Sequence, residues 1–125
     1  IDESPTELES LGKINLKDET NWEKIEKSMI EVINAPNGTA NNIKDTRYVI
    51  AGKTGTAQIK SYEDQEYEDI RENPFFRDHA LFVGYAPIPD PKLLILVIIE
   101  NGESGSRVAA PIAKAGFDYY LTKNE

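Results

Sequence analysis

The sequence predicts an α+β fold in which two helices pack on an antiparallel sheet of three strands. Apolar residues recur at helical spacing in 20–34 and in 107–125, and three strand-like runs lie between them, at 48–59, 79–87 and 92–100. Only a short turn joins the last two strands. This favours antiparallel neighbours over the long crossover that a parallel pair needs.

The composition is that of a soluble globular domain, with 39% apolar and 29% charged residues among 125. No repeat or linker interrupts the chain, so residues 1–125 are expected to be a segment of one domain. The formal net charge of −8 argues against a nucleic-acid partner, because phosphates would be repelled. The absence of cysteine excludes disulfides, thiolate nucleophiles and cysteine-bound metals.

The sequence contains no candidate membrane span, since its longest apolar run, 93-LLILVII-99, is far shorter than the ~20 residues that a spanning helix needs. The opening 1-IDESPTELES-10 lacks the basic and apolar regions of a signal peptide. If the parent protein is exported or anchored, that signal is expected to lie outside this chain.

The first helix is expected over 20–34, where Thr20 and Glu23 stand at capping-box spacing. The turn sequence 35-APNGTANN-42 should end it, because proline and Asn-Gly favour geometry that a helix cannot continue. A stripe of apolar residues on one face predicts that the helix docks by that face. The stripe consists of Trp22, Ile25, Met29, Val32 and Ile33.

The first strand, 48–59, contains Gly52 and Gly55. Glycine weakens a strand, and it usually marks a place where another backbone or a ligand comes close. The acidic run 61-SYEDQEYEDIRE-72 lacks the alternating ligand spacing of a calcium loop and is expected to be a solvated loop.

The later strands are separated by the proline-rich turn 87-PIPDP-91, where no sheet hydrogen-bond donors are needed. The third strand, 92-KLLILVIIE-100, is apolar on both faces. This pattern predicts a central strand that is covered by helices on each side.

The last helix is expected to begin near Val108, because Pro111 must lie in its first turn. Its predicted buried stripe is Ile112, Ala115, Tyr119 and Leu121. A second set of small residues would let the helix lie close against a sheet, namely Ala109, Ala110, Ala113 and Gly116.

The stretch 51-AGKTGTAQI-59 could belong to either of two kinds of site. A phosphate-binding loop needs glycine five positions before Gly-Lys-Thr and a helix after it, but Arg47 occupies that position and the sequence continues as a strand. As a strand, it places Thr54 and Thr56 on one face, where two hydroxyls can bind a carboxylate. Lys53 adds positive charge, and Gly55 would let a substrate backbone pair with the strand edge.

Five segments, in order along the chain, carry a resemblance to a known family. They are 37-NGTA-40, 50-IAGKTGTAQI-59, 78-DHALFVGYAP-87, 98-IIENGESGS-106 and 108-VAAPI-112. They resemble the C-terminal part of the transpeptidase domain of class B penicillin-binding proteins, most closely the penicillin-binding protein 2 subfamily of the elongation machinery. The resemblance implies a segment of the penicillin-binding/serine β-lactamase-like fold.

The resemblance also implies a reaction and roles for the residues of the motif. In this family a serine attacks the D-Ala-D-Ala end of a peptidoglycan stem peptide and passes the acyl group to a neighbouring amine, and β-lactams acylate the same serine. Lys53 would then join the charge network around the nucleophile, and Thr54 and Thr56 would bind the substrate carboxylate. Gly55 would keep the strand edge open, and the Thr56 N–H would donate to the oxyanion.

The family resemblance further implies an inner-membrane protein whose domain faces the periplasm, with a membrane glycosyltransferase as partner. No cofactor is implied. A metal site is not expected either, because the single histidine, His79, has no companion ligands in the sequence pattern. A structural hydrogen bond is favoured for His79 over proton transfer.

The chain departs from the family in lacking a Ser-x-Asn triplet and a convincing Ser-x-x-Lys motif. The literal match 10-SLGK-13 lies in polar surroundings, whereas the family's nucleophile begins a buried helix farther upstream, so Ser10 is rejected as the nucleophile. This chain alone is therefore expected to be inactive and to need the upstream part of the same domain. A serine β-lactamase, a D,D-carboxypeptidase and a non-catalytic sensor or scaffold domain of the same fold remain alternatives.

Overall fold

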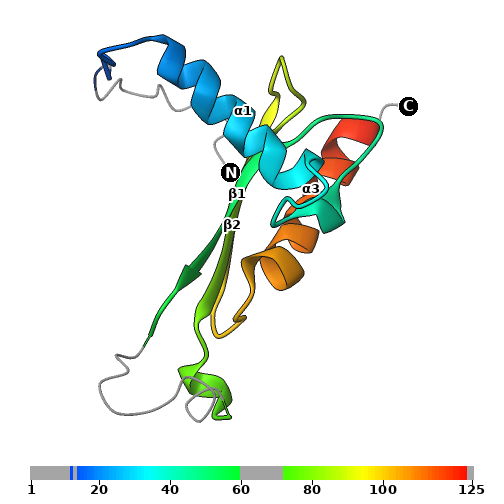
Figure 1. The fold of residues 1–125 in the computed structure, drawn as a ribbon. Helices are drawn as coiled ribbons and strands as arrows, with labels where there is room; N and C mark the ends of the chain where they lie inside the picture. Colours follow the sequence, from blue (N-terminus) through cyan, green and yellow to red (C-terminus); the bar gives the residue numbers. More distant parts are fainter. Residues whose placement is uncertain (1–11, 13, 60–71, 124–125) are drawn as a thin grey trace, which may run out of the picture.

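The computed structural model describes residues 12, 14–59 and 72–123, and it has the expected α+β architecture (Figure 1). Three strands form an antiparallel sheet in the order β1-β2-β3. Helix α1 packs beside β1, and helix α3 packs against β2 and β3. The strands are β1 (Ala51–Ala57), β2 (His79–Ala86) and β3 (Leu93–Ile99). The helices are α1 (Thr20–Asn34) and α3 (Ala110–Thr122), with short helical turns η1 (Asn41–Ile43), η2 (Pro74–Phe76) and η3 (Gly105–Ala109).

Helix α1 has the predicted bounds but a different N-terminal cap. The side chain of Asp18 accepts hydrogen bonds from the backbone N–H and the hydroxyl of Thr20, at 2.9 and 2.7 Å. The predicted capping box of Thr20 and Glu23 is therefore wrong, because the helix begins one residue earlier than that motif requires, with Glu19 as N-cap. The side chain of either Thr20 or Asp18 could accept a free N–H group of the first turn, and in the structure Asp18 does so.

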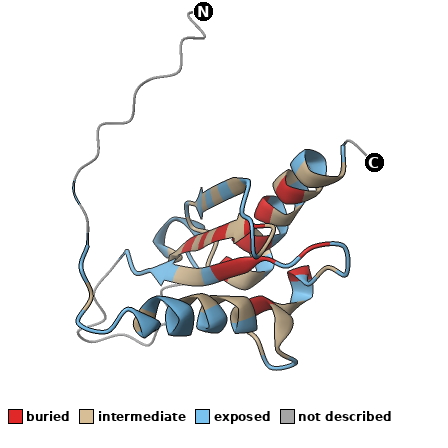
Figure 2. Cartoon of the chain, turned by 90° about the horizontal axis from the view of Figure 1, so that it is seen from above, coloured by how far each residue is buried: buried red, intermediate tan, exposed pale blue. Residues whose placement is uncertain are grey.

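The apolar stripe of α1 is buried only at its C-terminal end, where Ile33 is 1% exposed. Trp22 and Ile25 remain 46% and 48% exposed, so the prediction that the whole stripe docks is wrong for the described chain. Figure 2 shows α1 largely open to solvent while the middle of the sheet is buried. The stripe exists as predicted, but the described residues provide no layer that covers its first half.

Helix α3 packs on the sheet by its small residues together with Phe117, and not by Ile112 or Tyr119. Ala110, Ala113 and Phe117 are fully buried, whereas Ile112 and Tyr119 are 51% and 67% exposed. The predicted buried stripe of Ile112, Ala115, Tyr119 and Leu121 is therefore wrong, with Ala115 exposed and Leu121 half-buried. The predicted stripe and the set of small residues both recur at helical spacing. The small residues face the sheet, because short side chains allow the helix to pack close to it.

Helix α3 comes close to the sheet at Gly116. A Cβ atom there would lie 2.7 Å from Cδ1 of Ile95 on β3. The expectation of a close approach by small residues is confirmed. The largest fully buried side chains are Phe82, Phe117, Ile33 and Ile50, which form one core between the sheet and the helices.

Strand β3 lies at one edge of the described sheet, where its inward-facing residues alternate with exposed ones. Leu94, Leu96 and Ile98 are 64%, 58% and 55% exposed. The prediction of a central strand covered on each side is therefore wrong within the described residues, where helix α3 covers one face only. The apolar pattern nonetheless leaves an exposed hydrophobic face on β3.

None of the described helices combines the length and the apolar sequence that a membrane-spanning helix needs.

A cluster of charges ties the segment before β1 to α3. Lys114 lies 2.7 Å from Asp45 and 2.6 Å from Asp118, and the Tyr48 hydroxyl donates to Asp118 at 2.8 Å. Arg47 also pairs with both carboxylates. The Asp45 side chain is 9% exposed and that of Lys114 is 16% exposed, so this cluster is partly shielded from water.

The cluster shifts the ionisation of its members. The hydrogen bonds from Arg47 and then Lys114 hold the pKa of Asp45 well below its usual range. Burial alone would raise the pKa of Asp118, but hydrogen bonds from Lys114 and Tyr48 outweigh it and lower the pKa. Burial, followed by the bond to Asp118, raises the pKa of Tyr48 to about 12. The two carboxylates thus stay ionised at a lower pH than isolated aspartates would.

We expect Asp45→Asn to lower the free energy of unfolding by about 1–3 kcal/mol at pH 7, because it removes one of the two carboxylates that pair with Lys114 and Arg47. The folded-state pKa of Asp45 is depressed, so its stabilisation is complete above the unfolded pKa of about 3.9 and is lost progressively as the pH falls below it. Urea denaturation at pH 7 and pH 3 should show the variant's deficit shrinking at the lower pH. Asp90→Asn is the control, because Asp90 pairs with Lys92 at an exposed position and should change stability by less than about 0.5 kcal/mol. Equal effects of the two substitutions would contradict the structural role of the cluster.

Candidate functional site

The sequence Lys53-Thr54-Gly55-Thr56 lies within β1, which pairs with β2 along one of its edges. Among the described residues no strand pairs with the other edge of β1. Thr54 lies opposite Phe82 and Thr56 opposite Ala80, so the two threonines project from the same face of the strand. Within the described residues the site is thus an open strand edge next to a face that carries two hydroxyls.

The three side chains of this strand segment differ in exposure. Lys53 and Thr56 are exposed, whereas Thr54 is half-buried. The Lys53 ammonium donates to the carbonyl oxygen of Thr54 at 2.7 Å. Both exposed groups are accessible to a ligand that lies along the strand.

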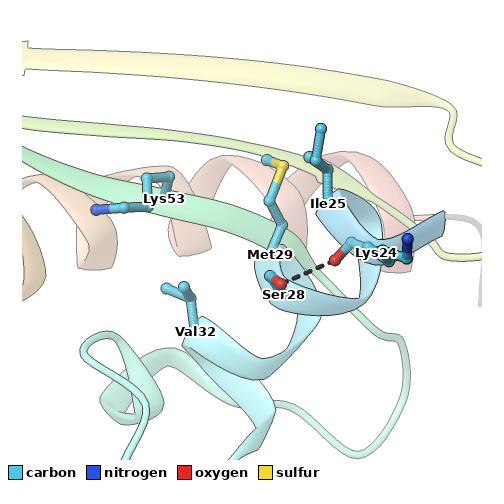
Figure 3. Close-up of a pocket in the computed structure, with 6 residues that line it drawn as sticks. All are labelled: Lys24, Ile25, Ser28, Met29, Val32 and Lys53. Atoms are coloured by element: carbon cyan, nitrogen blue, oxygen red, sulfur yellow. Dashed lines mark hydrogen bonds between the residues drawn. The ribbon is translucent and has the colours of Figure 1, made fainter. Parts of the chain in front are cut away.

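Lys53 also lines a groove between β1 and α1 (Figure 3). Lys53 lies at one end of the groove and Lys24 at the other, with Met29 and Ile25 between them. The lining is otherwise mostly apolar. Its full set is Lys24, Ile25, Ser28, Met29, Val32 and Lys53.

The two glycines of β1 have different reasons to be glycine. A Cβ atom on Gly52 would lie 2.7 Å from the ring of Phe82 and 2.9 Å from the carbonyl oxygen of Val83, so packing forbids a side chain there. A Cβ atom on Gly55 would meet only the side chain of Leu81, at 3.3 Å and 3.9 Å. Gly52 is therefore required by the core, whereas Gly55 leaves more space, with only the Leu81 side chain in contact. This space lies on the face of the strand opposite Thr54 and Thr56.

Thr39 is a neighbour of the site that the sequence analysis did not identify as one. Its hydroxyl lies 3.4 Å from the hydroxyl of Thr54. Thr39 reaches β1 because the turn after α1 folds back tightly, with the Ala40 N–H bonded to the carbonyl of Val32 at 2.9 Å. The Asn-Gly turn signal at 37-NGTA-40 was visible in the sequence, but its closeness to Thr54 required the fold.

His79 has a structural hydrogen bond, as favoured from the sequence. Its Nδ1 accepts the backbone N–H of Asn101 at 3.0 Å. Asn101 has a positive φ of 57°, and its side-chain amide donates to the carbonyls of Phe75 and Arg77, both at 3.0 Å. His79 therefore helps to hold the turn after β3 against the segment before β2.

Two of the sequence-based expectations fall outside the described residues. They concern Ser10 and the acidic run 61–72, of which only Glu72 is described. Within the described residues, no group of three or more histidine, aspartate or glutamate side chains could hold a metal ion.

Comparison with known proteins identifies the family. Residues 6–118 match the model of the penicillin-binding protein transpeptidase domain. The chain belongs to this family. The expected family and its mixed helix and antiparallel-sheet fold are thus confirmed.

Curated relatives include two peptidoglycan D,D-transpeptidases named MrdA. That of Haemophilus influenzae is 43% identical over 104 residues, which cover 82% of this chain and 16% of the relative. That of Acinetobacter baumannii is 45% identical over 112 residues, which cover 88% of this chain and 16% of the relative. The chain therefore spans about a sixth of the length of these relatives.

Solved structures of penicillin-binding protein 2 (PBP2) share the fold. Pseudomonas aeruginosa PBP2, in complex with WCK 5153, matches with a TM-score of 0.68 and 40% identity over 86% of this chain and 20% of that chain. A complex of PBP2 with MreC from Helicobacter pylori matches with a TM-score of 0.65 and 29% identity over 90% of this chain and 19% of that chain.

We expect Gly52→Ala and Gly55→Ala to differ in their effect on folding. Gly52→Ala should lower the free energy of unfolding by about 1–3 kcal/mol, because the added methyl group overpacks the core against Phe82 and Val83. Gly55→Ala should cost less than about 1 kcal/mol, since only the Leu81 side chain must give way. Urea denaturation of the two variants tests this, and an equal or larger loss for Gly55→Ala would refute the assignment of free space at that position.

Proposed function

We propose that this chain is the segment of a peptidoglycan D,D-transpeptidase that carries the Lys-Thr-Gly strand. The complete enzyme would cross-link stem peptides through a serine acyl-enzyme and would be acylated by β-lactams. The observation that carries the proposal is the open edge of β1, where Thr54 and Thr56 share a face beside Gly55 in a chain of the transpeptidase family.

The geometry suits recognition of an extended peptide that ends in a carboxylate. An unpaired strand edge can accept a peptide as an additional strand, which aligns it by main-chain hydrogen bonds. The hydroxyls of Thr54 and Thr56 would then bind the terminal carboxylate of the stem peptide or of a β-lactam, with Lys53 adding positive charge. Gly55 carries no side chain between the two threonines, so on the opposite face of the strand the edge is bordered only by the Leu81 side chain.

The acyl-transfer step requires a donor to the developing oxyanion. The backbone N–H of Thr56 would serve as one of two donors, because N–H groups of alternate residues in an edge strand point away from the sheet. Such a donor acts mainly in the transition state, so it contributes to the rate and little to ligand affinity. Lys53 would stabilise charge and protons around the attacking serine.

The nucleophilic serine would come from the upstream part of the same domain. The described residues offer an apolar surface on which this upstream part could dock. The exposed face of β3 with Leu94, Leu96 and Ile98 and the exposed first half of the α1 stripe are apolar. Large exposed apolar areas usually mark an interface. We infer that the rest of the domain covers them, and that this chain alone is inactive.

The relatives support a proposal for the partners and the location of the complete protein. MrdA proteins are named as peptidoglycan transpeptidases, and the H. pylori PBP2 structure is a complex with MreC. For this chain we propose the same cell-wall process, at the periplasmic side of the inner membrane with an anchor outside these residues. A membrane glycosyltransferase would supply the glycan strands that carry the stem peptides.

We expect Thr56→Val in the complete protein to slow acylation by penicillin about 10- to 100-fold, because it removes a hydrogen bond to a charged carboxylate while keeping the branched shape. Thr56→Ser should restore most of the rate. The measurement is the rate of adduct formation by intact mass. An unchanged rate in Thr56→Val would remove Thr56 from the site, and rapid release of hydrolysed penicillin would instead support a β-lactamase.

We expect Leu96→Asp to act differently in this chain and in the complete protein. In the isolated chain Leu96 is exposed, so the substitution should change the free energy of unfolding by less than about 0.5 kcal/mol. In the complete protein a buried charge on β3 should lower the free energy of unfolding by about 3 kcal/mol or more, and it should lower the melting temperature. A small effect in both would mean that this face is not the docking surface.

A further inference from the structure

The turn η3 presses on the backbone of β1 at the glycine of the Lys-Thr-Gly motif. Gly105, its first residue, is buried, and a Cβ atom built on it would lie 2.7 Å from the carbonyl oxygen and 3.1 Å from the nitrogen of Gly55. The same Cβ atom would lie 2.3 Å from the carbonyl oxygen of Leu81 on β2. The backbone of η3 therefore touches the two paired strands at the level of the candidate site.

The turn η3 is held in place by its own contacts. The Ser104 side chain caps it by accepting the N–H of Arg107 at 3.3 Å, and the Val108 N–H donates to the Ser104 carbonyl at 2.9 Å. The amide of Asn42 in η1 donates to the carbonyl of Ser106 at 2.9 Å. A surface that is anchored in this way can support the strand that lies against it.

We propose that Gly105 is a positioning residue for the acyl-transfer site, and that the η3 backbone sets the position of the peptide between Gly55 and Thr56. The inference rests on the proposed function, in which the N–H of that peptide donates to the oxyanion. Gly105 touches no substrate. It acts through the strand whose backbone it supports.

The topology explains why a side chain at Gly105 would move β1. Carbon–oxygen contacts normally fall at about 3.3–3.6 Å, so a methyl group placed 2.3 Å from the Leu81 oxygen needs a displacement of about 1 Å. Leu81 lies in β2, which is paired on both sides, whereas Gly55 lies in β1, which has one strand partner among the described residues. The strand with fewer hydrogen-bonded neighbours should yield first.

A displacement of β1 would affect the reaction rate more than ligand binding. Hydroxyl groups such as those of Thr54 and Thr56 can rotate to follow a carboxylate, but a backbone N–H cannot turn without moving the strand. Misplacement of a catalytic group by about 1 Å can reduce a rate about 100-fold. The oxyanion exists only after attack on the carbonyl, so its donor contributes to the acylation step.

The test compares Gly105→Ala with Gly84→Ala in the complete protein. Gly84 is also buried, and a Cβ atom there would lie 2.9 Å from the Phe82 ring and 3.1 Å from the Ala51 oxygen, so it strains β1 at its first residue and not at Gly55. Stopped-flow acylation with penicillin separates the limiting rate constant from the dissociation constant of the initial complex. For Gly105→Ala we expect the rate constant to fall about 10- to 100-fold, with less than a threefold change in the dissociation constant.

Gly84→Ala should lower the melting temperature without a comparable loss of the acylation rate constant. If both variants lose the rate constant equally, or if Gly105→Ala reacts like the unmodified protein, Gly105 is not a positioning residue. Failure of the unmodified protein to form any adduct would instead overturn the proposed function itself.

A milder variant keeps the inference testable if Gly105→Ala does not fold. Asn42→Ala removes the side-chain hydrogen bond to Ser106 and leaves the core intact, so it should loosen η3 against β1. We expect a fall of about threefold in the acylation rate constant at an unchanged melting temperature. An unchanged rate constant would count against support of β1 by η3.

Discussion

The antiparallel pairing of β1 with β2 is the constraint on which the rest of the structure depends. This pairing places Thr54 and Thr56 on one face and leaves the opposite edge of β1 without a strand partner among the described residues. It is possible because Gly52 lies over the Phe82 ring, where any side chain would collide. Packing at Gly52 therefore fixes how close the first part of β1 lies to the core. The motif residues follow along the rest of the strand.

The segments that flank the sheet keep this pairing in register. Before β1, the carboxylates of Asp45 and Asp118 share the ammonium of Lys114, which ties the entry to β1 to helix α3. After β3, the amide of Asn101 holds the segment before β2 while η3 lies against Gly55. The exposed site thus rests on a support of short-range polar contacts and close backbone packing.

Sequence patterns predicted the order and type of the elements well, because periodicity and turn residues act locally. They placed α1 at its observed bounds and all three strands to within about three residues at each end. They assigned Ile112 and Tyr119 to the buried face of α3, but these residues are exposed and Ala113 is buried. Two different sets of apolar residues recur at helical spacing in this helix, so the spacing could not show which set faces the sheet. They also predicted that both faces of β3 are covered, whereas one face is exposed in the described residues. An apolar pattern indicates that a face is suited to burial, but it does not show which part of the protein covers it.

The sequence by itself determined the chemistry of the candidate site: a strand with period-two threonines beside a lysine and a glycine, in a chain whose motifs resemble one family. These features depend only on neighbouring residues and on the alternation of a strand. The tertiary structure alone decided that Gly52 is required by packing while Gly55 is open, and that Thr39 and Gly105 lie against the motif. Such contacts join residues far apart along the chain, and the distances between them are set by how closely the helices and turns pack on the sheet.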